Sequence, residues 1–175
     1  APTPKMSFEQ LPFEAYPNFD NFVREVCRVV KKFPDKQLII KPHPQADFLS
    51  NITKIIREID PSIPILYNAS LVELINSCDL VITFNNSTVM LESMILAKPV
   101  ISLQTEKWAE KDDLMKTNAF LPISDMAEIE NNIKKILSDA DFKNLLLKNS
   151  KDFVDNYLVH HGTASHELAK LLDGF

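Results

Sequence analysis

The sequence predicts an α/β fold, with a Rossmann-like three-layer α/β/α arrangement, a mostly parallel sheet and a helical C-terminal tail. Short apolar runs alternate with segments of helical periodicity. The runs are apolar without interruption, which is typical of parallel strands covered on both faces. A chain of 175 residues is long enough for one domain that buries roughly 70% of its unfolded surface. We therefore expect a single domain over 1–175, with an irregular segment at 1–18.

The first half of the chain is predicted as helices alternating with strands. One-sided apolar stripes predict helices over 19–33 and 49–59. Residues 38–40 form a short β-branched run, predicted as a strand that ends before Pro42 because proline cannot continue a central ladder. Residues 63–67 form the second predicted strand.

The second half continues the alternation and then becomes helical. Ser70 is predicted to cap a short helix that ends at Cys78. Three further strands are predicted, at 80–84, 99–103 and 120–123. Four further helices are predicted, one from the turn at 85–88 to Ala97, one from a cap at Ser124 or Asp125 to Leu137, one over 141–158 and one over 163–172.

Composition excludes several classes of function. Nineteen basic against twenty-four acidic residues leave a net charge of −5, which argues against a general nucleic-acid or anionic-membrane binder. Only two glycines occur, so there is neither a P-loop nor a GxGxxG dinucleotide fingerprint. No apolar run approaches membrane-spanning length. Cys27 and Cys78 lie in apolar helical patterns, which predicts buried thiols in a reducing compartment.

The turn after the strand at 80–84 is the first candidate site. In open parallel sheets, ligands bind outside the carboxyl ends of the strands. Asn85, Asn86, Ser87 and Thr88 follow the strand and open a helix, whose start attracts phosphate through unpaired N–H groups and a partial positive charge. Asparagine also tolerates the left-handed backbone that glycine would otherwise supply. Simple N-capping by the same residues is an equal alternative.

Glu92 strengthens the phosphate interpretation. It lies in a helix that is apolar nearly all round and therefore predicted to be buried, where an acidic side chain needs a partner. Thr88 and Glu92 are four residues apart, so they share a helix face at a separation of about 6 Å along the axis. A phosphate at the helix start and a ribose bound by Glu92 would suit that spacing. The alternative is a buried salt bridge to a lysine or a histidine.

His43 is the second candidate. Residues 41–44 read Lys-Pro-His-Pro, and prolines on both sides fix where the imidazole points. A histidine held at a strand's carboxyl end is suited to hydrogen-bond a phosphate or a leaving-group oxygen, and a capping or packing role is the alternative. His160, His161 and His166 lack a carboxylate or cysteine that would complete a ligand set, so neither a metal nor a cofactor is predicted.

These motifs together resemble the carboxyl-terminal half of GT-B-type glycosyltransferases. A strand ends in the HP motif at 41–44, the turn and helix at 79–92 carry an S/T…E motif, and Lys98-Pro99-Val100-Ile101 closes the segment. The resemblance covers residues 36–103 and is nearest to the capsule-polysaccharide, polysialyltransferase-like and glycerophosphotransferase-like groups. Hydrolysing UDP-N-acetylglucosamine 2-epimerases have a related half-domain, but with a Ser-Gly-Gly turn in place of residues 86–88.

The resemblance implies binding of a nucleotide-activated sugar donor, linked to CMP, CDP or UDP. The HP histidine and the Ser/Thr turn contact the phosphates in such enzymes and the helix glutamate holds the ribose, which carries over to His43, Asn86, Ser87, Thr88 and Glu92. His43 would then assist catalysis as a hydrogen-bond donor to the leaving group. The implied pathway is cell-surface polysaccharide synthesis.

The resemblance also implies a partner domain. GT-B enzymes hold the acceptor site and the usual base in an amino-terminal domain, so we expect the chain, which starts at Ala1, to be an inactive fragment of a longer protein. The expected location is the cytoplasm, or the inner membrane face as a peripheral protein. An epimerase half-domain and a non-catalytic module on the same fold are the competing interpretations.

Overall fold

A computed structural model describes residues 18–43, 46–85, 87–105, 113–158, 160 and 162–173. The chain divides into two compact units, residues 1–68 and residues 69–175. The predicted irregular segment at 1–18 lies outside the described residues except for Asn18. Each unit is described by itself below.

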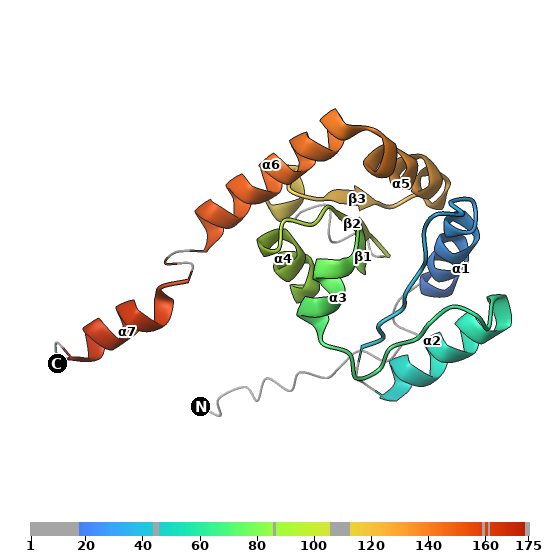
Figure 1. The fold of residues 1–175 in the computed structure, drawn as a ribbon, viewed down its shortest axis with the longest axis horizontal. Helices are drawn as coiled ribbons and strands as arrows, with labels where there is room; N and C mark the ends of the chain where they lie inside the picture. Colours follow the sequence, from blue (N-terminus) through green and yellow to red (C-terminus); the bar gives the residue numbers. More distant parts are fainter. Residues whose placement is uncertain are drawn as a thin grey trace, which may run out of the picture. The chain divides into compact units, whose positions relative to one another are not determined.

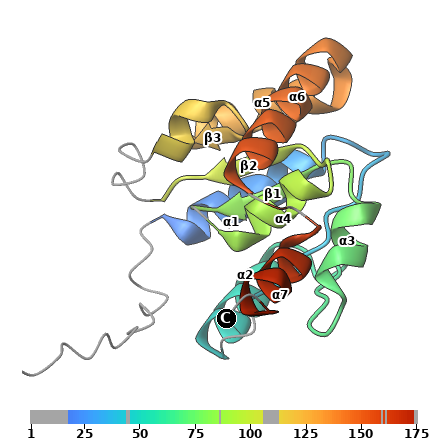
Figure 2. The ribbon, with the colours of Figure 1, turned by 90° about the vertical axis from the view of Figure 1, so that its left-hand side faces the viewer.

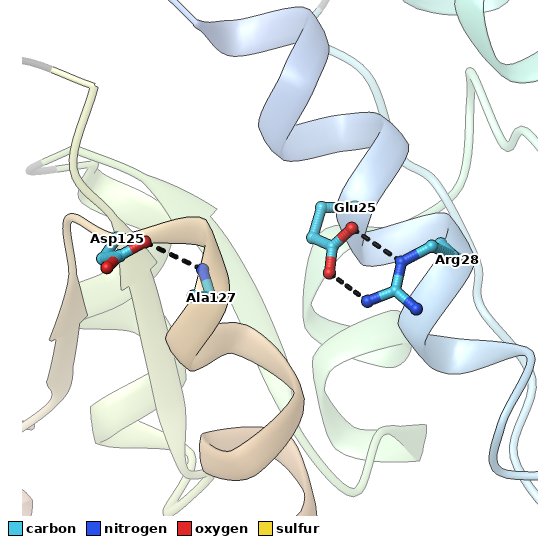
Figure 3. A network of polar contacts seen from close by, with 4 residues as sticks. All are labelled: Glu25, Arg28, Asp125 and Ala127. Atoms are coloured by element: carbon cyan, nitrogen blue, oxygen red, sulfur yellow. Dashed lines mark hydrogen bonds and ion pairs between the residues drawn. The ribbon is translucent and has the colours of Figure 1, made fainter.

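The first unit is built on two packed helices, α1 (Phe19–Val30) and α2 (Ala46–Ile59). The apolar face of α1 is buried, and so are three isoleucines of α2, which are Ile52, Ile55 and Ile56. Arg24 and Glu58 form an ion pair of 2.8 Å between the two helices. On α1 itself, Arg28 donates to both carboxylate oxygens of Glu25 (Figure 3). Helix α1 ends three residues before the predicted boundary.

The two strands predicted at 38–40 and 63–67 shrink to one parallel bridge between Ile40 and Ile65. Ile40 N donates to Pro64 O at 2.9 Å, and Leu66 N donates to Ile40 O at 2.8 Å. Pro64 has no N–H and Pro42 follows on the other segment, so neither side offers the donors that a longer ladder needs. The prediction of two full strands is wrong for this reason.

The second unit contains a parallel sheet of three strands in the order β1-β2-β3 (Figure 1). These are β1 (Val81–Phe84), β2 (Val100–Leu103) and β3 (Leu121–Ile123). Val81 pairs with Val100 and Ile101 pairs with Leu121. All four residues of β2 are buried, as expected for the central strand of a parallel sheet. The α/β class with a parallel sheet is therefore confirmed.

Helix α4 (Thr88–Ile95) connects β1 to β2 and packs on both strands. It also packs against α6 (Ala140–Tyr157), and α6 packs against α5 (Ile129–Ser138). Both views show α4 and α6 side by side (Figures 1 and 2). The core between these elements contains six buried residues, which are Met90, Met94, Val100, Ala119, Phe120 and Val154.

The remaining elements of this unit are short or terminal. They are α3 (Leu71–Ser77), the 3-10 turns η3 (Asp113–Thr117) and η4 (Met126–Glu128), and α7 (Ala164–Asp173). Helix α7 has no buried residue and forms the predicted helical tail. None of the helices in the described ranges has the length and apolar character needed to cross a membrane.

Side-chain caps fix where several of these helices begin. Ser70 Oγ accepts from Glu73 N at 3.4 Å, which confirms the predicted cap of α3. Asp125 Oδ1 accepts from Ala127 N at 2.9 Å at the start of η4 (Figure 3). Asp139 Oδ1 accepts from Phe142 N at 2.9 Å at the start of α6. Each cap satisfies an N–H group that the helix leaves unpaired.

Candidate functional site

The turn between β1 and α4 lies at the carboxyl edge of the parallel sheet. Strand β1 ends at Phe84 beside Leu103, the last residue of β2. The chain then turns and enters α4 at Thr88. This is the edge at which open α/β sheets bind ligands. The structure thus places the turn at the carboxyl edge of the sheet, as the strand pattern predicts, although Asn86 lies outside the described residues.

Ser87 is the N-cap of α4. Its backbone is extended, and its Oγ accepts from Val89 N at 3.3 Å, near the long limit for such a bond. The carbonyl oxygen of Ser87 accepts from Met90 N at 3.0 Å. Two of the N–H groups at the helix start are thus bonded within the helix. The alternative of N-capping is therefore observed for Ser87.

Thr88 is the first residue of α4, and its side chain is exposed. Neither its N–H nor its hydroxyl bonds to any residue that the structure describes. An N–H group at a helix start carries part of the positive end of the helix dipole. Thr88 therefore offers two donors at the carboxyl edge of the sheet.

Glu92 lies one turn further along α4 and is half-buried. The predicted burial of the whole helix is only partly correct, because Met90, Ser93 and Met94 form its buried face while Ile95 is exposed. Within residues 69–175, the carboxylate of Glu92 makes no ion pair or hydrogen bond with a described residue. The alternative of a salt bridge to lysine or histidine is thus not seen in this unit.

Asn85 holds the turn in the left-handed conformation, with φ of 49°. The sequence predicts this use of asparagine in a chain with few glycines. Its side chain is buried and bonds to Thr105, the second residue after β2. From the sequence, Thr105 was interpreted as either a residue lining the cleft or part of a surface loop. Its bonds to Asn85, and the buried polar residues Ser102 and Gln104, were not predicted. The sequence signal that could have identified these residues is the pair of polar residues Gln104 and Thr105 directly after an apolar strand.

His43 belongs to the first unit, whereas Ser87, Thr88 and Glu92 belong to the second. It follows the Ile40–Ile65 bridge, with an exposed side chain beside the buried Pro42. Lys41 Nζ donates to the carbonyl oxygen of Tyr67 at 3.4 Å. The phenol of Tyr67 in turn bonds to Thr53 Oγ1 at 2.8 Å. Lys41, Thr53 and Tyr67 are neighbours that the sequence analysis did not single out.

The two thiols differ in burial. Cys27 is fully buried, and burial raises its pKa to about 11. Cys78 is half-buried, and burial raises its pKa as well. Cys27 and Cys78 are both free thiols and form no disulfide with each other, as predicted. Among the described residues, no three His, Cys, Asp or Glu side chains lie close enough together to hold a metal ion.

The profile of the LIC12162 family transferases matches residues 20–118, which is more than half of the chain and contains β1, α4 and β2. The curated proteins compared with the chain gave no match. The matched range also contains His43, Ser87, Thr88 and Glu92. On this match, the chain belongs to the LIC12162 family of transferases.

Proposed function

We propose that the chain is the donor-binding part of a glycosyltransferase for cell-surface polysaccharide. The donor is a sugar linked to CMP, CDP or UDP. Membership of a transferase family supports group transfer as the reaction. The resemblance of residues 36–103 to GT-B enzymes supports a nucleotide-activated sugar as the substrate.

The turn at the start of α4 receives the phosphate in this proposal. The N–H and hydroxyl of Thr88 have no acceptor among the described residues, and they stand at the positive end of α4. Ser87 Oγ accepts one bond from Val89 N and still has its own proton to donate. Asn86 is proposed to join them from the sequence motif alone. These groups would stabilise negative charge on a leaving phosphate.

Glu92 carries the argument for a nucleotide. Glu92 is half-buried, and no described residue of its own unit gives the carboxylate a partner to offset its lost hydration. Two ribose hydroxyls would supply the missing donors at a distance of about 6 Å from the helix start, which matches a nucleoside phosphate. A simple N-cap explains Ser87 but leaves this carboxylate unexplained.

In the proposed reaction the acceptor oxygen forms a bond to the anomeric carbon of the sugar. The bond from that carbon to the phosphate oxygen breaks, and its electron pair stays with the nucleotide. The proton of the acceptor passes to a base in an amino-terminal acceptor domain. The resemblance to GT-B enzymes, and not a contact between the two units, assigns His43 a hydrogen bond to the leaving phosphate. In a glycerophosphotransferase, the same groups would serve a displacement at phosphorus.

Calorimetric titration with CMP, CDP and UDP tests the proposal. We expect weak binding, within the millimolar range, of at least one nucleotide by the chain. Glu92→Gln keeps the shape of the side chain but removes its charge, so it should weaken that binding about tenfold or more. Asp141→Asn removes one exposed charge from the start of α6 and serves as the matched control.

Three results would contradict the proposal. The first is absence of binding by all three nucleotides at millimolar concentration. The second is equal affinity of Glu92→Gln and the unchanged chain. The third is a fall in the thermal unfolding temperature of Glu92→Gln with no effect on affinity, which would indicate a structural ion pair.

A further inference from the structure

A buried pair of side chains joins the ends of β1 and β2. Asn85 Nδ2 donates to Thr105 Oγ1 at 2.9 Å, and Thr105 N donates to Asn85 Oδ1 at 2.9 Å. Both residues are 8% exposed. The nitrogen and the oxygen of the Asn85 carboxamide therefore both bond to Thr105, the second residue after β2. We call this the Asn85–Thr105 pair.

The backbone of Asn85 is fixed to the same strand. Asn85 N donates to Leu103 O at 2.9 Å, which continues the ladder one residue beyond β1. Ser102 Oγ donates to Asn85 O at 2.7 Å. Backbone and side chain together hold Asn85 at φ of 49°, a conformation that residues with a Cβ adopt only against a steric penalty.

The pair belongs to a longer buried relay. Gln104 Nε2 donates to Ser102 Oγ at 2.8 Å, and the hydroxyl proton of Ser102 goes to Asn85 O. Hydrogen bonds in such a chain polarise one another in a low-dielectric interior. Ser102 and Gln104 are both buried, at 0% and 5% exposed. Because Gln104 donates to Ser102 and Ser102 donates to Asn85 O, these bonds fix the orientation of the Asn85 carbonyl group.

That carbonyl is directly connected to the cap of α4. Ser87 N donates to Asn85 O at 3.1 Å, so Asn85 O receives bonds from Ser87 and from Ser102. A displacement of Asn85 would therefore move Ser87, whose Oγ caps Val89 N. Two hydrogen bonds therefore connect the Asn85–Thr105 pair to the first turn of α4. One runs from Ser87 N to Asn85 O, and the other runs from Val89 N to Ser87 Oγ.

We propose that Asn85 and Thr105 are positioning residues of the donor phosphate site. They contact no ligand themselves. They set the left-handed turn that presents Ser87 and the donors of Thr88 to phosphate, and they tie the chain leaving β2 to the same edge. The identity of the ligand rests on the proposed function, whereas the geometry of the pair rests on the hydrogen bonds between Asn85 and Thr105.

Two substitutions separate positioning from packing. Asn85→Gly keeps a residue that adopts φ of 49° readily but removes the carboxamide. Thr105→Val keeps the volume but removes Oγ1 and leaves Asn85 Nδ2 without its acceptor. Thr105→Ser restores the hydroxyl. Thr163→Val deletes the same atoms from an exposed threonine before α7 and is the matched control.

The measurement is calorimetric titration with whichever of CMP, CDP and UDP the unchanged chain binds best, together with thermal unfolding of each variant. We expect Asn85→Gly and Thr105→Val each to weaken binding about fivefold or more, as for loss of a coupled pair. The double variant should bind no more weakly than the weaker single variant. Thr105→Ser should recover most of the loss, and Thr163→Val should show none.

The outcomes distinguish this inference from the proposed function. If the unchanged chain binds nucleotide and Asn85→Gly and Thr105→Val bind it equally well, the positioning role is overturned and the proposed function stands. If no nucleotide binds, the proposed function fails, and amide hydrogen exchange at the bonded N–H groups of Ser87, Val89 and Met90 decides whether the pair holds the turn. Faster exchange there in Thr105→Val supports the role of the pair in holding the turn, and unchanged exchange overturns it.

Discussion

At the scale of single residues, the proposed function rests on the carboxylate of Glu92 and the imidazole of His43. Glu92 was predicted as a ligand-binding residue because it is acidic and lies inside an apolar helix. The structure places it half-buried, with no partner among the described residues of its own unit. The sequence could not show that α4 buries only one face, because the apolar residues of the helix lie on several sides of it. Burial there is decided by which face meets β1, β2 and α6.

His43 provides a test of its own at this scale. If His43 hydrogen-bonds the phosphate, as the resemblance implies, His43→Gln should weaken nucleotide binding about threefold to tenfold, because the amide replaces the imidazole donor with one of different geometry. His166→Gln changes an exposed histidine on α7 and should leave affinity unchanged. Titration calorimetry of both variants checks this. Equal affinities for the two variants would remove His43 from the site.

The thiols give a prediction that does not involve any ligand. Burial raises the pKa of Cys27 to about 11, so at about pH 8 only about one molecule in a thousand carries the thiolate. Cys78 is half-buried and more accessible to reagent. A chromogenic disulfide reagent should therefore label Cys78 at least about tenfold faster than Cys27 in the folded chain. Kinetics of Cys27→Ser and Cys78→Ser assign the phases, and faster labelling of Cys27 would contradict the burial described here.

At the scale of elements, the apolar periodicity predicted most helices within a few residues. Ser70 acts as the predicted cap of α3. Of the two residues predicted to cap the later helix, Ser124 or Asp125, it is Asp125 that acts as a cap, at η4 before α5. The strands at 38–40 and 63–67 were overpredicted, because a β-branched run shows strand propensity but not whether a partner segment offers N–H groups. Pro64 removes one of those donors. Such pairing information is absent from the local sequence.

The caps of α4 and α6 should respond differently to substitution. Asp139→Ala breaks a bond of 2.9 Å and should cost about 1 kcal/mol of unfolding free energy. Ser87→Ala breaks a longer bond of 3.3 Å and should cost about 0.5 kcal/mol. The effect on nucleotide affinity should be the reverse, since only Ser87 lies in the proposed site. Denaturant unfolding with calorimetry measures both, and equal affinity losses would argue against a ligand role for Ser87.

At the scale of the whole molecule, the alternation of strands and helices predicted the parallel sheet, and the structure confirms it as β1-β2-β3. The division into units 1–68 and 69–175 was not predicted. No composition shift marks it, since Asn68-Ala69-Ser70 reads as an ordinary turn before a capped helix. Likewise, Asn85 and Thr105 are twenty residues apart in the sequence, so a local sequence pattern could not predict that they bond to each other.

Acid should destabilise the first unit in a defined range. The hydrogen bonds from Ser62 and the ammonium group of Lys31 lower the pKa of Asp60 from 3.8 to about 2. Arg28 lowers the pKa of Glu25, and Arg24 lowers the pKa of Glu58. Because these folded-state values lie below the unfolded ones, the stabilisation is present above about pH 4 and is lost as pH falls toward about 2.

Hydrogen exchange across that range checks the acid prediction. Protection of α1 and α2 should fall between about pH 4 and about pH 2. Asp60→Asn, which cannot titrate there, should show a smaller pH dependence and lower protection at neutral pH. A loss of protection in α1 and α2 that is as steep in Asp60→Asn as in the unchanged chain would contradict the assignment to Asp60.

The central claim is that the start of α4 and Glu92 together bind a nucleoside phosphate. Backbone amide chemical shifts, followed by NMR during titration with CMP, CDP or UDP, test it most directly. The account predicts that the largest shifts fall on Ser87, Thr88, Val89 and Glu92, and that Glu92→Gln strongly reduces them at the same nucleotide concentration. Shifts confined to other elements, or none at millimolar nucleotide, would contradict it.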